Sequence, residues 1–315
     1  MYKQRSSERH PLESLVYLVL LAVAGGILFT LVALIFAMLV FKIPPTEIMT
    51  QIIYGITDIR LLKTLQVFST VGIFIVPALV FARIESSKPL TWLKINRSVS
   101  FPVLLISLLL IFCIGPFLQF TINLNAGMHL PHWLNGLERW MRLQEDQAAL
   151  ITKQFLEGKT PAVLIINMLM IAALPAIGEE LLFRGCLQQL FIRWFRNPYM
   201  AIWVTAIVFS AIHVQFFGFL PRMLLGALLG YLFFWTKNIW VSIAVHFTNN
   251  AMSVILAYYY QLQGKPLDDL INETDPVTWY ACLGSIVVSA MLLLVIYRIT
   301  KNTYSQPDTD GEQLA

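Results

Sequence analysis

The sequence predicts an all-α fold, a polytopic bundle of transmembrane helices with about eight spans. Of its 315 residues, 57% are hydrophobic and only 13% are charged, whereas globular domains are about 45–50% apolar. The mean hydropathy is +0.70. Low-charge apolar stretches long enough to cross about 30 Å of hydrocarbon recur along the chain. We therefore expect membrane spans rather than one large soluble core.

Each expected span is a low-charge apolar stretch. The first follows the basic segment MYKQRSSERHPLES. It is too long for the hydrophobic region of a signal peptide and has no evident small-residue cleavage site, so we interpret it as a retained span. The expected spans are Leu15–Phe41, Leu65–Phe81, Phe101–Phe120, Pro161–Arg184, Tyr199–His213, Phe219–Trp235, Ile239–Tyr260 and Val277–Tyr297.

These spans divide the chain into six regions. They are a cytoplasmic N-terminal segment (1–14), three N-terminal transmembrane helices (15–120), an amphipathic loop (121–160), a transmembrane core with polar motifs (161–260), a last transmembrane helix (261–300) and a polar tail (301–315). The composition of the tail is typical of disorder. No internal repeat is visible.

The long loop 121–160 contains apolar residues at three- to four-residue steps with charges between them, interrupted only by Gln144. These residues are Leu137, Met141, Ala148, Ile151 and Phe155. The pattern predicts an amphipathic helix that lies on the bilayer surface or covers one end of the bundle.

The distribution of Lys and Arg indicates an orientation. With the N-terminus inside, more than half of these residues fall in inner segments, and the segment GKPLDDLINETDP on the outer side is acidic. The positive-inside rule then places both termini in the cytoplasm. We expect a multi-pass protein of the cell membrane.

The charge argues against a nucleic-acid partner, and the cysteine content argues against disulfides and thiolate metal sites. The net charge of +4 is small and comes without basic runs interleaved with aromatic residues, so nucleic acid is not an expected partner. Cys113, Cys186 and Cys282 lie far apart and form no CxxC pair, so we expect neither disulfides nor thiolate metal sites.

The segment LPAIGEELLFRG places two carboxylates and a guanidinium inside an apolar stretch. Ionisable groups in a span are costly and mark function or pairing. Glu180 and Arg184 have the i, i+4 spacing of a helical ion pair, with the acid first. Glu179 points about 100° away and remains available to face a cavity. A structural reading, in which all three residues form a buried network that locks the bundle, stays open.

Two further motifs place polar residues in later spans. Phe209 precedes His213 by four residues and should pack on its imidazole; His246 precedes Asn250 by one helical turn and shares its face. Taken alone, either histidine fits a packed core or interfacial role. Gly226 and Gly230, in the span between the motifs, have a small-xxx-small spacing that permits close helix contact.

The expected helix lengths place Glu179 and His213 level with each other across an antiparallel hairpin. They lie about 27 Å before and about 24 Å after a turn near Asn197, at 1.5 Å per residue. His246 lies only about 14 Å after Lys237 on the same rule. Either the turn at Asn197 projects beyond the bilayer or the expected helix ends are displaced.

The ordered motifs Glu-Glu-x-x-x-Arg, Phe-x-x-x-His and His-x-x-x-Asn, each on a separate membrane helix, resemble those of the CPBP family (CAAX protease and bacteriocin-processing, or Abi). These are intramembrane proteases related to the type II CAAX prenyl endopeptidase. The resemblance covers roughly Pro161 to Tyr260.

The resemblance implies an intramembrane glutamate endopeptidase, an enzyme type often classed with the metalloproteases, and it implies roles for particular residues. Glu179 would match the catalytic glutamate and His213 the histidine that helps it to activate water. His246 and Asn250 would match the pair that stabilises the oxyanion. The supporting residues would be Glu180, Arg184 and Phe209.

We therefore expect hydrolysis of a peptide bond in a membrane-associated protein or peptide, by a glutamate-activated water and with no required cofactor. In one alternative, Glu179, His213 and His246 bind Zn²⁺ with an open fourth position, although no HExxH pair is present. In others, the protein is a non-catalytic bacteriocin-immunity or binding protein, or a proton-coupled transporter. The lack of an inverted repeat argues against the transporter alternative.

Overall fold

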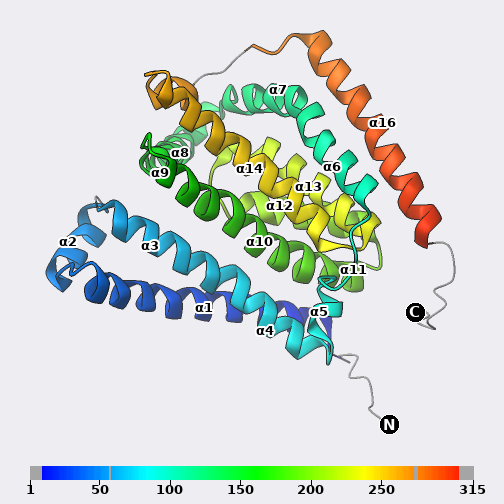
Figure 1. Ribbon diagram of the computed structural model, residues 1–315, viewed down its shortest axis with the longest axis horizontal. Coiled ribbons are helices and arrows are strands. Elements are labelled where there is room, and N and C mark those ends of the chain that lie inside the picture. The colour runs from blue at the N-terminus through cyan, green and yellow to red at the C-terminus, as the bar shows by residue number, and fades with distance from the viewer. Residues whose placement is uncertain (1–8, 57, 273–275, 305–315) are drawn as a thin grey trace.

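The computed structural model describes residues 9–56, 58–272 and 276–304, and within them it contains helices and no strands. Figure 1 shows the helices gathered into one bundle, with the α1–α4 hairpin along one side and α16 along the other. The predicted all-α bundle is confirmed. The tail that we expected to be disordered lies largely outside the described residues, as does most of the N-terminal segment.

The N-terminal side is a helical hairpin. α1 (Pro11–Val40) leads through α2 (Pro45–Tyr54) to α3 (Ile59–Thr70), which continues through the π-helical η1 (Val71–Ile75) into α4 (Val76–Glu85). A buried network ties this hairpin to the rest of the bundle. Glu85 accepts hydrogen bonds from Ser14 (2.8 Å) and from Arg193 (2.8 Å).

One long helix carries the Glu-Glu motif. Its consecutive segments are α9 (Pro161–Asn167), η3 (Met168–Ala173), α10 (Leu174–Glu180), η4 (Leu181–Gln188) and α11 (Gln189–Phe195). η3 and η4 are π-helical, a conformation that frequently occurs at functional sites. The predicted span Pro161–Arg184 is therefore the first part of an apolar helix of 35 residues.

Three further helices follow the long helix in the chain and pack against it. α12 (Pro198–Ala211) is followed by η5 (Phe216–Gly218), α13 (Phe219–Thr236) and α14 (Ile239–Leu262). Asn197 and Asn238 cap the starts of α12 and α14 by accepting hydrogen bonds from backbone N–H groups of the first turn. The two asparagines follow residues with left-handed backbone, Arg196 (φ 53°) and Lys237 (φ 50°).

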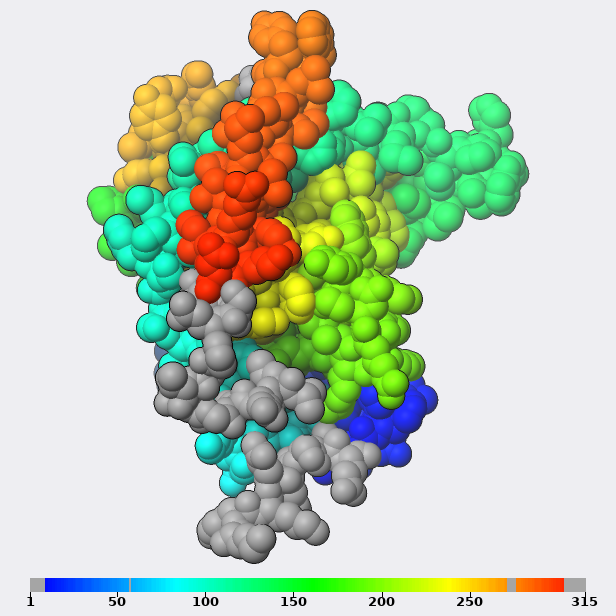
Figure 2. All heavy atoms as spheres, turned by 90° about the vertical axis from the view of Figure 1, so that its right-hand side faces the viewer, coloured from blue at the N-terminus to red at the C-terminus, as the bar shows by residue number. Residues whose placement is uncertain are grey.

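The remaining helices pack around this core. α6 (Phe101–Cys113) and α7 (Gly115–Ala126) meet at a bend of 42°. Figure 2 shows α16 (Trp279–Tyr304) as an outer column of the bundle. The short elements are α5 (Pro89–Trp92), η2 (His132–Leu134) and α15 (Leu267–Asn272).

The predicted number of eight spans is too high for the described residues. All eight expected segments contain helix, but only six helices have the length and composition of a span, or seven if α6 and α7 count as one bent span. The exception is α12, whose 14 residues measure about 21 Å against about 30 Å of hydrocarbon. It ends at Ala211, so His213 lies in the following turn and not in a span.

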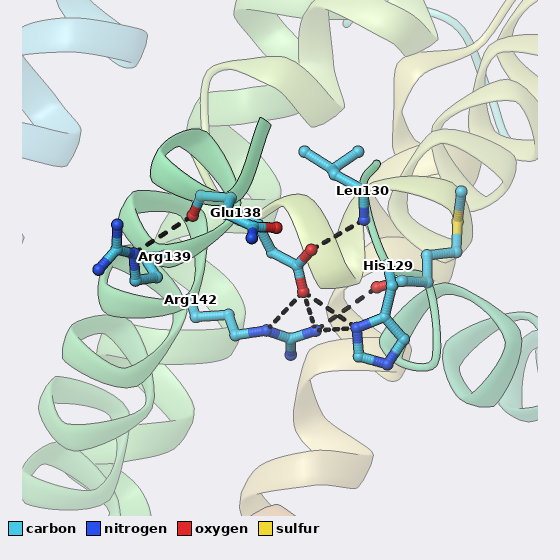
Figure 3. A network of polar contacts seen from close by, with 7 residues as sticks. His129, Leu130, Glu138, Arg139 and Arg142 are labelled. Carbon is cyan, nitrogen blue, oxygen red and sulfur yellow. Dashed lines mark hydrogen bonds and ion pairs between the residues drawn. The ribbon is translucent and has the colours of Figure 1, made fainter. Parts of the chain in front are cut away.

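The predicted amphipathic helix is confirmed as α8 (Asn135–Leu156). A polar network fixes its first turns to the chain that precedes it (Figure 3). Glu138 accepts hydrogen bonds from Arg142 (2.7 Å) and from the Leu130 N–H (2.8 Å), and His129 lies 3.1 Å from it. These contacts, with that of Arg142 the largest, lower the pKa of Glu138 to about 2, so the carboxylate stays ionised at physiological pH.

Gly226 and Gly230 produce the close helix contact that their spacing predicts. A Cβ on Gly226 would lie 3.1 Å from the Phe209 ring. A Cβ on Gly230 would lie 2.9 Å from both Ile202 and the Gln188 amide oxygen. Only glycine lets α13 approach the long helix and α12 this closely.

We expect Gly230→Leu to lower the free energy of unfolding by about 1–3 kcal/mol or more, because the added atoms overpack the contact with Ile202 and Gln188. Gly284→Leu is the matched control, since no atom lies within 4 Å of a Cβ at Gly284 on α16. The melting temperatures of the two purified variants should differ clearly. Equal melting temperatures would contradict the close packing at Gly230.

Candidate functional site

A fully buried ion pair lies at the centre of the bundle. Arg184 Nη1 donates a hydrogen bond to Glu180 Oε1 at 2.7 Å, and both side chains are 0% exposed. Arg184 Nη2 donates to the Gly226 carbonyl at 3.0 Å, and the guanidinium carbon lies 4.7 Å from the centre of the Phe209 ring. The predicted i, i+4 pair is confirmed. The guanidinium of Arg184 also contacts α13, through Gly226, and α12, through Phe209.

His246 of α14 joins this pair. Its Nδ1 lies 2.8 Å from Glu180 Oε1. Because an ionised carboxylate only accepts hydrogen bonds, Nδ1 carries the proton and donates it, and Nε2 of the neutral ring is left as the acceptor. Glu180 thereby sets both the tautomer and the direction of the imidazole.

The second carboxylate lies on the other side of the same ring. Glu179 Oε2 is 3.8 Å from His246 Nε2. The adjacent glutamates diverge along the helix, as expected, yet they meet opposite nitrogens of one imidazole. A separation of 3.8 Å is too long for a direct hydrogen bond but suits a bridging water. The side chain of Glu179 is 12% exposed, whereas that of Glu180 is fully buried.

His213 is connected to the other site residues by its contacts with Phe209. Its Nδ1 lies 2.8 Å from the Phe209 carbonyl oxygen, which only accepts, so Nδ1 donates and Nε2 is free to accept. The Phe209 ring lies edge-on to the rings of His213 (5.2 Å) and His246 (6.0 Å), which confirms the predicted packing on His213. Within the described chain, no hydrogen bond or ion pair joins His213 directly to Glu179.

Asn250 lies one turn beyond His246 and faces the same long helix. Its Nδ2 donates to the Ile171 carbonyl at 3.4 Å, and its Oδ1 accepts from Asn249 at 3.3 Å. Ile171 lies in η3, about two turns before Glu179. The structure therefore places Asn250 on the side of α14 that faces the Glu-Glu helix.

The predicted depths of Glu179 and His246 disagreed because the long helix projects past the start of α14. A Cβ on Gly185 would lie 3.3 Å from Ile239, so α14 begins level with Gly185. The long helix continues from there to Phe195, and the turn at Asn197 follows. This extension of the long helix past the start of α14 accounts for the different predicted depths.

Arg222 is a charged residue near the site that the sequence reasoning missed. It lies on α13, and its charge interacts with those of Glu179 and Glu145. Its guanidinium donates a hydrogen bond of 2.6 Å to the Gln215 side chain, in the turn that also holds His213. The signal was present, because Arg222 is an ionisable residue inside a predicted span.

An apolar cavity of about 440 Å³ adjoins the turn that holds His213. Ala211, Val214 and Gln215 line one side, and Met141 of α8 lines another. α8 is anchored over this turn, because Glu145 accepts a hydrogen bond from the Phe217 N–H at 3.3 Å. The cavity therefore lies between α8 and the turn after α12, and none of the predicted site residues is among the side chains that line it.

Of the three side chains in the zinc alternative, Glu179 and His246 lie together, and no hydrogen bond or ion pair in the described chain joins His213 to either of them. Both histidines use Nδ1 for a hydrogen bond, to Glu180 and to the Phe209 carbonyl, and keep Nε2 available. In the part of the chain that the structure describes, no group of three His, Cys, Asp or Glu side chains is placed to hold a metal ion.

We expect Glu180→Gln and Arg184→Met each to lower the free energy of unfolding by about 3–5 kcal/mol, because each leaves a buried charge without its partner. Thermal melting of the purified protein measures this loss. Glu157→Gln is the control, since Glu157 is exposed. If Arg184→Met has the same melting temperature as the wild type, the ion pair does not stabilise the fold.

Comparison with known proteins confirms the resemblance over this part of the chain. Residues 161–252 match the sequence model of a family described as type II CAAX prenyl endopeptidase Rce1-like. The matched segment contains all seven predicted site residues. They are Glu179, Glu180, Arg184, Phe209, His213, His246 and Asn250.

A curated relative from Bacillus subtilis (strain 168), the uncharacterized protein YpbD, is 26% identical over 134 residues. The alignment covers 41% of this chain and 64% of that protein, so the chain spans less than two thirds of its relative's length. No solved structure matches.

Proposed function

We propose that the protein is an intramembrane endopeptidase in which Glu179 activates the water that attacks a peptide bond. The observation that carries this proposal is the arrangement around His246. Glu180 fixes one nitrogen of the imidazole at 2.8 Å, and Glu179 faces the other at 3.8 Å. The family match over residues 161–252 supports the same reaction class.

In the proposed reaction, the water lies between Glu179 and His246 Nε2. Glu179 removes a proton while the water oxygen attacks the carbonyl carbon, and a tetrahedral intermediate with an oxyanion forms. The proton then passes to the leaving nitrogen as the C–N bond breaks. The products are a carboxylate and an ammonium group, because the proton of the new carboxylic acid also goes to the amine, and Glu179 is regenerated. His213, with a free Nε2, assists Glu179 in the proton transfer.

The oxyanion needs donors. Asn250 provides an amide N–H₂, and His246 provides Nε2–H when its ring is protonated. The Glu180 carboxylate at Nδ1 holds the ring in the orientation for this contact, as a carboxylate does behind a catalytic histidine. Arg184 in turn holds Glu180 at the required position. In this proposal Glu180 and Arg184 act through His246 and do not contact the substrate.

The surroundings of the site indicate a membrane-associated protein or peptide as substrate. Glu179 and His246 lie on helices with the composition of membrane spans, and the cavity beside the turn after α12 is lined mainly by apolar side chains. We propose that an apolar part of the substrate occupies this cavity. Proteomics of membrane fractions, comparing wild type with Glu179→Ala, should identify the uncleaved precursor.

We expect Glu179→Gln to abolish cleavage of that precursor without a change in melting temperature, because the amide has nearly the same shape but cannot accept the proton. Glu157→Gln is the control for the same chemical change at an exposed position. Retained cleavage would remove Glu179 from the role of base. If the wild type produces no cleavage at all, a binding, immunity or transport function takes precedence.

We expect Asn250→Ala to lower kcat by about 10²–10³ and to leave KM nearly unchanged, because a lost oxyanion donor acts only in the transition state. Thr248→Ala on the same helix is the control, since its hydroxyl donates to its own helix at Ala244. Steady-state kinetics on the identified substrate separates the two constants. A rise in KM alone would assign Asn250 to ground-state binding.

Metal analysis alongside activity tests the zinc alternative. Under the glutamate mechanism, we expect active protein to contain no stoichiometric metal, and chelators to leave activity unchanged. His246→Ala should then lower kcat without altering metal content. Stoichiometric zinc that is lost together with activity in His246→Ala would establish the zinc mechanism in its place.

A further inference from the structure

A large apolar cavity lies away from the candidate site, between the N-terminal hairpin and the long helix. It measures about 660 Å³. Phe36 of α1 and Phe68 of α3 line one wall, with their rings 5.5 Å apart. Ile166, Ala173 and Ile177 line the other. Figure 1 shows α3 running alongside the long helix of α9 and α10. We call this space the hairpin groove.

The hairpin groove has two distinct ends. At its inner end the walls meet, because a Cβ on Gly178 would lie 3.0 Å from Phe74 Cβ in η1. Its outer end lies near the start of α3, where Lys63 Nζ donates to Asn167 Oδ1 at 3.4 Å. From Ile166 to Ile177 the groove is about 16 Å long. This length matches one leaflet of a hydrocarbon layer about 30 Å thick.

The outer end carries two cations, of which Lys63 has no ion-pair partner in the described chain. Arg60 and Lys63 both line the groove there. Arg60 is paired with Asp58 at 2.6 Å, but the hydrogen bond of Lys63 goes to a neutral amide. No carboxylate in the described chain lies within ion-pair distance of Lys63. A cation at the end of an apolar groove complements a ligand with an anionic head and an apolar chain.

We propose that the hairpin groove binds one anionic phospholipid, with an acyl chain against Phe68 and Ala173 and the phosphate at Lys63 and Arg60. Both cations lie in the first turns of a span, where the headgroups of a bilayer lie. The apolar lining matches an acyl chain and offers little to a peptide backbone, which needs hydrogen-bond partners in a membrane. The proposal does not depend on peptidase activity.

The test counts bound lipids by native mass spectrometry after reconstitution in nanodiscs of phosphatidylcholine with a minority of phosphatidylglycerol. We expect the wild type to retain one phosphatidylglycerol in preference to phosphatidylcholine. Lys63→Gln should reduce this retention about fivefold, the equivalent of about 1 kcal/mol per basic residue near the headgroups. Lys42→Gln is the control, because Lys42 is exposed beside the same end of the hairpin and does not line the groove.

A second variant tests the apolar part without changing charge. Ala173→Phe fills the groove and should abolish lipid retention, whereas Ala290→Phe on the exposed face of α16 should not. Equal retention of both lipids by the wild type, or retention unchanged in Lys63→Gln and Ala173→Phe, would overturn the proposal. Loss of peptide cleavage in Ala173→Phe with lipid retention intact would assign the groove to substrate and equally overturn it.

Discussion

The structure depends on one constraint, which is that a guanidinium buried in an apolar bundle needs polar partners. Arg184 finds them in Glu180 and in the carbonyl of Gly226, and its guanidinium lies over the face of Phe209, while its Nε has no hydrogen-bond partner in the described chain. These partners lie on α10, α13 and α12, so pairing a single charge fixes how these helices pack together. Replacing a buried ion pair by apolar residues often leaves the free energy of unfolding unchanged. We therefore infer that the Glu180–Arg184 pair serves more to position these helices than to stabilise the fold.

The same pair organises the chemistry of its neighbours. Glu180 Oε1 accepts from both Arg184 and His246, so the orientation of the imidazole follows from the packing of the guanidinium. Gln188 repeats the pattern one turn later by donating to the Gly230 carbonyl at 3.0 Å. Gly226 and Gly230 thus have two roles. They allow the helices to approach closely, and their carbonyl groups accept the hydrogen bonds of Arg184 and Gln188.

Much of the fold and part of the site were predictable because they depend on local periodicity. The Glu180–Arg184 pair, the packing of Phe209 on His213 and the helix α8 each follow from residues three to four positions apart. The contact of His246 with Glu180 does not, since it depends on how far α11 projects past α14. Arg222 was missed because its partners, among them Glu145 on α8, come from distant segments.

The short helix α12 has a consequence for the position of His213. A helix of about 21 Å is shorter than a hydrocarbon layer of about 30 Å. Its last residue, Ala211, is followed by a turn that holds the exposed residues Ile212 and Val214 and, between them, the half-buried His213. The imidazole is therefore presented by a turn at the end of a helix, whereas Glu179 and His246 are presented from within full-length apolar helices.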